Sequence, residues 1–131
     1  MGTNTALEIL LVDDELGMLE VYAETLQRGL QAVRLVALSD PRTAASTLRE
    51  GHFDLMVTNV HMPGMNGMRL LRLAKECSPD MPVVVVTGYP MRETAEEARA
   101  LGAAGYVTKP FDPEDFLSRI RGVLDQRTVS E

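Results

Sequence analysis

The chain has 131 residues, of which 45% are hydrophobic and 24% are charged, which suits one globular domain that buries roughly two thirds of its unfolded surface. Its net charge of −6 disfavours nucleic acid or an anionic membrane as the partner of this domain. No apolar run approaches the roughly 20 residues of a membrane span and residues 1–6 lack a signal-peptide pattern, so we expect a cytoplasmic protein.

The first half of the chain alternates apolar runs with amphipathic stretches. Residues 8–12 form a near-continuous apolar run, typical of a strand covered on both faces. Residues 33–38 form a second run that contains an arginine, which favours a strand nearer the sheet edge. Between these strands, apolar residues recur at helical spacing up to Gly29, where we expect the helix to end. Asp40 and Pro41 then supply the N-cap and first-turn proline of a short helix.

The second half of the chain continues this alternation. The remaining predicted elements are strands at residues 55–58, 83–86 and 106–108 and helices at residues 68–77, 92–101 and 113–124. The run of valines at 83–86 is the best candidate for a central strand. The helix at 92–101 is thinly apolar, which predicts a loosely held element. Cys77, the single cysteine, is expected to be a small packed residue, and the polar tail from Gln126 is expected to fray.

Five strands alternating with five helices through short connections predict an α/β fold with a doubly wound parallel sheet and right-handed crossovers. No repeat, low-complexity segment or linker divides the chain. We therefore expect a single domain over residues 1–131, with its core at about 8–124 and a polar tail or the start of a linker at 125–131.

Polar side chains follow four of the predicted strands at the point where each strand ends. Asp13 and Asp14 follow the first strand, Asn59 the third, Thr87 the fourth and Lys109 the fifth. Because the carboxyl ends of parallel strands meet at one edge of a sheet, these side chains are expected to share a pocket. Acids that close a buried strand repel one another unless a cation lies among them, and Mg²⁺ prefers such oxygen ligands.

In this order and spacing, the sequence resembles the receiver domain of two-component response regulators over nearly its whole length. The resemblance is carried by the acidic pair, by Met-Pro-Gly-Met-Asn-Gly at residues 62–67, by Thr87-Gly88 and by Lys109-Pro110-Phe111. It implies a flavodoxin-like fold with strand order 2-1-3-4-5. It also implies that Lys109-Pro110 is a cis peptide.

The resemblance assigns roles by position. In the family, a histidine kinase phosphorylates an aspartate at the end of the third strand, and Mg²⁺ is held by the acidic pair and a backbone carbonyl. Asp14 corresponds to the principal metal carboxylate, Asp13 to its helper, often through water, and His61 to the residue that lends its main-chain oxygen. Thr87 corresponds to the residue that hydrogen-bonds the phosphoryl group, and Lys109 to the one that pairs with it.

Asn59 departs from the family, because it stands where the phosphoacceptor aspartate is expected. An acyl phosphate cannot form on an amide oxygen, which is neutral and delocalised toward nitrogen. Mg²⁺ binding is expected to weaken with the loss of one carboxylate, although the Asn59 carbonyl can still serve as a ligand. Lys109 is expected to donate a hydrogen bond to that carbonyl.

Two explanations of Asn59 stay open. In the first, the chain is a natural receiver that has lost phosphorylation and works as a binding module, that is, a pseudo-receiver. In the second, Asn59 is an engineered replacement of aspartate in an ordinary phosphoacceptor domain. The retention of Asp13, Asp14, Thr87 and Lys109 fits a site that is in use or only recently abandoned.

Tyr106 holds the position of the family's switch aromatic. In the family, Thr87 moves toward the phosphoryl group while this aromatic swings inward and remodels the surface of the helix at 92–101, the strand at 106–108 and the last helix. The implied partners are a sensor histidine kinase or another signalling protein, and a second copy of the chain bound through that surface.

Two other functions on the same fold compete with a non-enzymatic signalling module. Aspartyl-phosphate phosphatases resemble Asp-x-Asp followed by Thr or Val, whereas Asp13 is followed two positions on by Glu15. A nucleotide or flavin binder is disfavoured because no Gly-x-Gly-x-x-Gly follows the first strand and no Gly-x-x-x-x-Gly-Lys-Ser/Thr occurs. We therefore predict that the chain is not an enzyme.

Overall fold

The computed structural model describes residues 6–129 of the chain. Five parallel strands form one sheet in the order β2-β1-β3-β4-β5, which confirms the predicted fold and strand order. The strands are β1 (Leu7–Val12), β2 (Val33–Leu38), β3 (Leu55–Asn59), β4 (Val83–Thr87) and β5 (Gly105–Thr108). The arginine-containing strand β2 lies at an edge, and the valine strand β4 lies inside the sheet, both as predicted.

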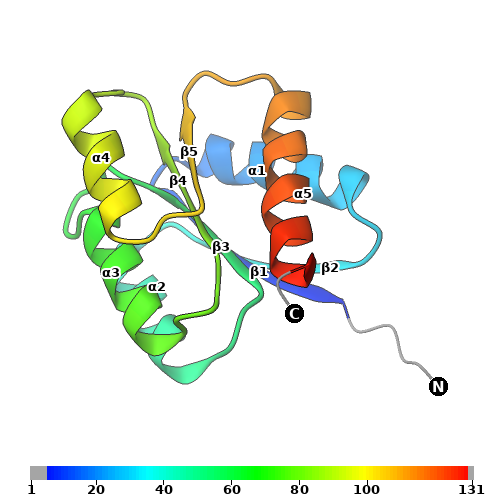
Figure 1. The fold of residues 1–131 in the computed structure, drawn as a ribbon, viewed down its shortest axis with the longest axis horizontal. Coiled ribbons are helices and arrows are strands. Elements are labelled where there is room, and N and C mark those ends of the chain that lie inside the picture. Colours follow the sequence, from blue (N-terminus) through cyan, green and yellow to red (C-terminus); the bar gives the residue numbers. More distant parts are fainter. Residues whose placement is uncertain (1–5, 130–131) are drawn as a thin grey trace.

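Helices cover both faces of this sheet (Figure 1). They are α1 (Leu16–Gly29), α2 (Pro41–Glu50), α3 (Gly67–Cys77), α4 (Arg92–Ala100) and α5 (Pro113–Val129). Helices α1 and α5 share one face and its buried cluster, whereas α2, α3 and α4 share the other. The result is a three-layer sandwich, as expected when each strand is followed by a crossover helix.

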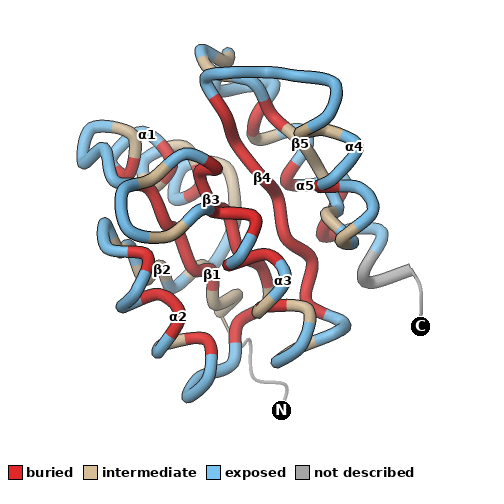
Figure 2. The backbone as a smooth tube through the Cα atoms, turned by 90° about the vertical axis from the view of Figure 1, so that its left-hand side faces the viewer, coloured by how far each residue is buried: buried red, intermediate tan, exposed pale blue. Residues whose placement is uncertain are grey.

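The inner strands form the most deeply buried part of the molecule, as Figure 2 shows for β1, β3 and β4. Successive side chains of a strand point to opposite faces, so Val83 and Val85 pack toward α2, α3 and α4. Val84 and Val86 pack toward α1 and α5. Burial on both faces explains the continuous apolar runs of the sequence and makes the sheet a rigid frame for the residues at its carboxyl edge.

The helices differ in how firmly they are held. Helix α3 buries five residues, including Leu70, Leu71 and Ala74, whereas α4 buries only Ala98, in agreement with its thin apolar stripe. The prediction for Cys77 was wrong, because this last residue of α3 is exposed. Helix α5 continues to Val129, beyond the expected end of the core, so the polar tail begins as a helix.

Helix α1 ends at Gly29 as predicted. The glycine does not end the helix by adopting a left-handed backbone conformation. The positive φ angles among the described glycines are at Gly64 and Gly102. A Cβ atom added at Gly29 would overlap the side chain of Leu117 on α5, and Arg121 of α5 donates a hydrogen bond of 2.8 Å to the Gly29 carbonyl. The glycine therefore permits the close approach of α5 to α1.

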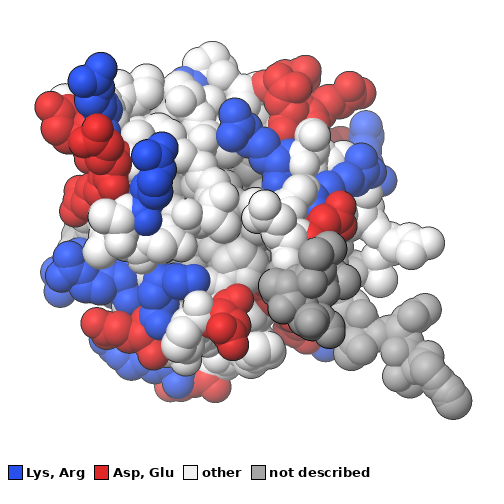
Figure 3. All heavy atoms as spheres, in the orientation of Figure 1, with Lys and Arg blue, Asp and Glu red and all other residues white. Residues whose placement is uncertain are grey.

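Acidic and basic side chains are interspersed over the face of the molecule seen in Figure 3, so charge on this face is locally compensated. Large apolar side chains are exposed at Leu16, Val21, Tyr89 and Met91. Leu16 begins α1, and Tyr89 and Met91 lie in the loop between β4 and α4. Within residues 6–129, no helix has the length and apolar character needed to cross a membrane.

Candidate functional site

A pocket of about 370 Å³ opens at the carboxyl edge of the sheet. It is lined by Asp14, Glu15, Asn59, His61, Gly88, Tyr89 and Lys109. The structure thus brings together residues that follow β1, β3, β4 and β5, as predicted from the strand ends. A larger hollow of about 810 Å³ lies between α1 and α5, and none of the predicted site residues lines it.

Strand register places these residues at one level. Val12 pairs with Thr58, Asn59 with Val86, and Thr87 with Thr108. The loop after β3 folds back on this edge, because the Gly67 amide donates a 2.7 Å hydrogen bond to the Val60 carbonyl. A Cβ atom at Gly67 would overlap the main-chain oxygen of Asn59, so only glycine allows α3 to start this close to the end of β3.

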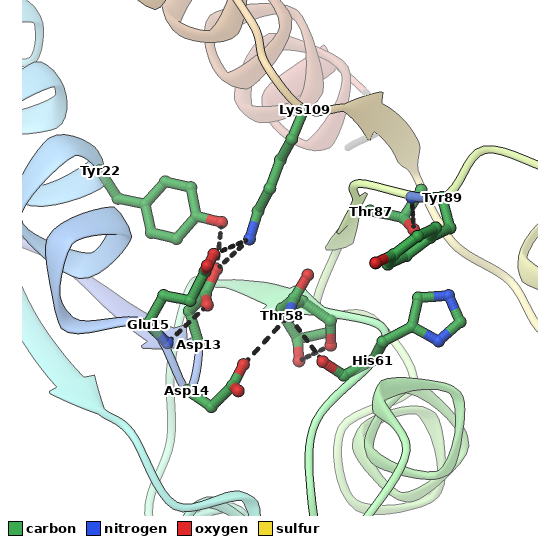
Figure 4. A network of polar contacts seen from close by, with 10 residues as sticks. Asp13, Asp14, Glu15, Tyr22, Thr58, His61, Thr87, Tyr89 and Lys109 are labelled. Carbon is green, nitrogen blue, oxygen red and sulfur yellow. Dashed lines mark hydrogen bonds and ion pairs between the residues drawn. The ribbon is translucent and has the colours of Figure 1, made fainter.

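Asp13 is fully buried, and hydrogen bonds or ion pairs occupy both of its carboxylate oxygens (Figure 4). Oδ2 accepts a hydrogen bond of 2.7 Å from the Tyr22 hydroxyl and lies 3.0 Å from Lys109 Nζ. Oδ1 accepts a 3.0 Å hydrogen bond from the Glu15 amide. Burial raises the pKa of Tyr22 and the Asp13 charge raises it further, so the phenol remains a hydrogen-bond donor to Asp13.

Lys109 is paired with acids rather than with Asn59. Its ammonium lies 3.0 Å from Asp13 Oδ2 and 3.0 Å from Glu15 Oε1, and the Lys109-Pro110 peptide is cis, as the resemblance implied. Among the described residues, Lys109 makes no hydrogen bond to Asn59, so that prediction was wrong. The physical reason is that two carboxylates attract an ammonium more strongly than a neutral amide does.

Asn59 is nearly buried, with 6% of its surface exposed. Its side-chain nitrogen donates a 3.0 Å hydrogen bond to the His61 main-chain oxygen and a 3.3 Å hydrogen bond to Asp14 Oδ1. Both partners are acceptors, which requires that the NH₂ group of the amide faces them. The carbonyl oxygen of Asn59, the atom expected to serve a metal, therefore does not face Asp14 or the His61 carbonyl.

These donors fit Mg²⁺ only in part. Asp14 Oδ1 and the His61 carbonyl oxygen contact the same amide group, and carboxylate and carbonyl oxygens are ligands that Mg²⁺ prefers. Asp13 is already engaged by Tyr22 and Lys109, and Asn59 presents N–H groups, which cannot ligate a cation. Within the described part of the chain, no group of three or more His, Cys, Asp or Glu side chains is placed to hold a metal ion.

The remaining predicted residues are Thr87, His61 and Tyr106. Thr87 is fully buried, and its Oγ1 accepts a 3.0 Å hydrogen bond from the Tyr89 amide. The exposed imidazole of His61 meets the Tyr89 ring edge-on, with 5.4 Å between ring centroids. Tyr106 packs against the cluster on the α2–α4 face, and its buried hydroxyl has no hydrogen-bond partner among the described residues.

Two residues of this network, Tyr22 and Glu15, were not predicted to belong to the site. Tyr22 was assigned only to the apolar stripe of the first helix, although a buried tyrosine hydroxyl usually finds a partner, and the nearby Asp13 was a candidate. Glu15 follows the acidic pair in the sequence, but no role in the pocket was predicted for it. The ion pair between Lys109 and Glu15 depends on where the sheet places β5, so the local sequence around either residue does not predict it.

Comparison with known proteins decides the family. Residues 9–121 match the family model described as the response regulator receiver domain. The chain belongs to this receiver family. The receiver is 35% identical over 127 residues to the response regulator protein FleR of Pseudomonas aeruginosa, covering 96% of the chain. It is also 35% identical over 122 residues to the chemotaxis protein CheY of the same organism, covering 92% of the chain.

A solved structure agrees with this assignment. The crystal structure of a CheY-like receiver domain protein from Methanospirillum hungatei has a TM-score of 0.90 and 26% identity to this receiver, and the match covers 97% of this chain and 100% of that one. The alignments cover 98% of CheY but only 26% of FleR. The chain therefore spans about a quarter of the length of FleR.

Proposed function

We propose that this receiver is a binding module of two-component signalling, not an enzyme, and that Asn59 does not accept a phosphoryl group. The proposal depends on one observation. The residue at the end of β3, set in the pocket with Asp14 and Lys109, is a carboxamide. An acyl phosphate forms when a carboxylate oxygen attacks the phosphoryl group, and the neutral amide oxygen of Asn59 cannot form a stable one.

Signal transmission would then depend on partner binding. Without a covalent modification to favour one state, a partner shifts the equilibrium between two conformations by its difference in affinity for them. The movable region is the surface of α4, β5 and α5. Its mobility is supported by the weak anchoring of α4 through Ala98 and by the position of Tyr106 beside it.

The proposed partner is a sensor histidine kinase or another signalling protein. Exposed apolar side chains near the pocket support a protein partner, since Leu16 is 66% exposed, Tyr89 71% and Met91 55%. A homodimer through α4, β5 and α5 is the second possibility. A hollow of about 340 Å³ on that surface, lined in part by Arg99, Tyr106 and Arg119, supports it.

We also propose that this pocket binds Mg²⁺ only weakly. Asp14 and the His61 carbonyl oxygen would hold it, because Asp13 is already engaged by Tyr22, Lys109 and the Glu15 amide. When bound, the ion would supply positive charge beside the Asp14 carboxylate. The binding is expected to be weak because Asn59 replaces a carboxylate.

The alternative is an ordinary phosphoacceptor receiver in which Asn59 replaces the aspartate. The presence of Asp13, Asp14, Thr87 and Lys109 supports it, because these residues all end or follow strands at the same edge of the sheet. The two alternatives differ in whether Asn59 is natural or engineered. Both predict that the chain with asparagine at position 59 is not phosphorylated there.

Phosphorylation can be tested by incubating the protein with Mg²⁺ and acetyl phosphate and measuring its intact mass. The unaltered chain is expected to gain no phosphoryl group, whereas an Asn59→Asp variant is expected to gain one. An Asn59→Ala variant is the control for modification elsewhere. Phosphorylation of the unaltered chain would refute the proposal, and an unmodified Asn59→Asp variant would show that position 59 is not an acceptor site.

A further inference from the structure

The Asn59 amide makes its two hydrogen bonds to the two oxygens that would hold a divalent cation. One is Asp14 Oδ1 at 3.3 Å and the other is the His61 main-chain oxygen at 3.0 Å. An NH₂ group carries two donors and partial positive charge. It therefore meets both oxygens in the way that a cation between them would.

A cation cannot bind beside the amide in this arrangement. The N–H groups would point at the ion, so the side chain would have to turn and present its oxygen. That turn breaks the hydrogen bonds to Asp14 and to the His61 carbonyl. Two hydrogen bonds of ordinary net strength correspond to a roughly tenfold to hundredfold penalty on affinity.

The rest of the pocket is also satisfied without a metal. Asp13 is neutralised by Lys109 and bound by the Tyr22 hydroxyl and the Glu15 amide. Freeing it for an ion would leave the Tyr22 hydroxyl buried without a partner, which is costly. Asp13 therefore has no free oxygen with which to offset the loss at Asn59.

We propose that Asn59 is an internal competitor of the divalent cation, which holds Asp14 and the His61 carbonyl in place of Mg²⁺. It is not a weakened metal ligand. The inference deepens the proposed function, since it concerns the same pocket, but it does not depend on whether a phosphoryl group is transferred. The receiver is complete and stable in the absence of a divalent ion.

Calorimetric titration with Mg²⁺ distinguishes a competitor from a weak ligand. Asn59→Ala removes the amide without changing the charge of the pocket, so electrostatics are matched. If the amide competes, the alanine variant binds Mg²⁺ about tenfold more tightly than the unaltered chain. If the Asn59 oxygen is a ligand, the variant binds Mg²⁺ more weakly, and that result overturns the proposal. Equal affinity of the two proteins also overturns it.

Two further measurements make the test independent of how well the alanine variant folds. In the unaltered chain, Mg²⁺ or a chelator is expected to leave the melting temperature unchanged, whereas Asn59→Asp should gain a Mg²⁺-dependent stabilisation. In NMR spectra of the unaltered chain, the Asn59 side-chain NH₂ signals should not move at Mg²⁺ concentrations that saturate Asn59→Asp. A saturable movement of these signals, or metal-dependent melting of the unaltered chain, contradicts the proposal.

Asn66→Ser is a matched control for replacing an asparagine near the pocket. The Asn66 side chain accepts a 2.7 Å hydrogen bond from the Met68 amide and caps α3, and serine can keep that cap. The Mg²⁺ affinity of the Asn66→Ser variant should equal that of the unaltered chain. A change as large as that of Asn59→Ala would mean that the loop, and not the amide, controls the metal, which also counts against the proposal.

Discussion

Two tyrosines on opposite faces of the sheet show how differently the two sides of this receiver are built. Tyr22 of α1 is fully buried in the cluster shared with α5, and its hydroxyl is bound to Asp13. Tyr106 of β5 is partly buried against the cluster on the other face, and its hydroxyl lacks a partner among residues 6–129. The buried tyrosine hydroxyl is satisfied on the first side and left without a partner among the described residues on the second.

The packing of the neighbouring helices follows the same division. The Tyr22 ring stacks on Phe111, with 6.1 Å between ring centroids, and contacts Phe116 at a tilt, with 5.5 Å between centroids. Next to Tyr106, α4 is held by Ala98 as its one buried residue. An element with few buried apolar contacts opens at lower free energy. From this comparison we expect the α1–α5 side to stabilise the fold more than the α4–β5 side does.

The largest expected effect is on the stable side, at the ion pair of Lys109. Lys109→Met leaves the Asp13 carboxylate buried without its countercharge, with only the Tyr22 hydroxyl and the Glu15 amide as partners. We expect the free energy of unfolding to fall by about 3 kcal/mol, measured by urea denaturation. A double variant with Asp13→Asn should recover part of the loss, and no recovery would mean that Lys109 acts by packing alone.

Tyr22→Phe should have the next largest effect. It keeps the ring stacking and removes the 2.7 Å hydrogen bond to Asp13, and a hydrogen bond to a charged group contributes about 1.5–3 kcal/mol. We expect a loss of unfolding free energy near the lower end of that range, because Lys109 remains. A variant as stable as the unaltered chain would remove the basis of the comparison.

Alkaline pH should reduce the stability that the same hydrogen bond provides, because the Tyr22 phenol of the unfolded chain ionises while the folded chain keeps its proton. Because burial and Asp13 raise the pKa of Tyr22 in the folded chain above the value of about 10 in the unfolded chain, the folded chain holds the phenol proton more tightly. The resulting stability is complete below about pH 10 and is lost as pH rises above it. Urea denaturation between pH 9 and pH 11 should therefore show a smaller decline for Tyr22→Phe than for the unaltered chain.

Tyr106→Phe should have the smallest effect, with the opposite sign. It removes a buried hydroxyl that has no partner among the described residues, so the variant should be unchanged or more stable by up to about 1 kcal/mol. A loss of stability comparable to that of Tyr22→Phe would show that the hydroxyl is satisfied in solution, and the contrast between the two sides would fail.

Much of this architecture was predictable from local patterns. Helical and strand periodicity located the ten elements, and the strand ends located Asp13, Asp14, Asn59, Thr87 and Lys109 at one edge of the sheet. Such predictions succeed because apolar periodicity reflects which side of an element is buried, and parallel strands bring their carboxyl ends to the same edge. The residue type at position 59 is also the basis of the proposal that the chain is not phosphorylated there, since an acyl phosphate does not form on an amide.

Only the tertiary structure decided which atoms meet. The sequence did not determine that Asn59 presents its nitrogen to Asp14, that Lys109 pairs with Glu15, or that Tyr22 binds Asp13. Each contact joins groups from different elements, and its geometry depends on the packing of the sheet and the helices. Hydrogen-bond choice among several donors and acceptors is settled by distances of a few tenths of an ångström, which residue order alone does not specify.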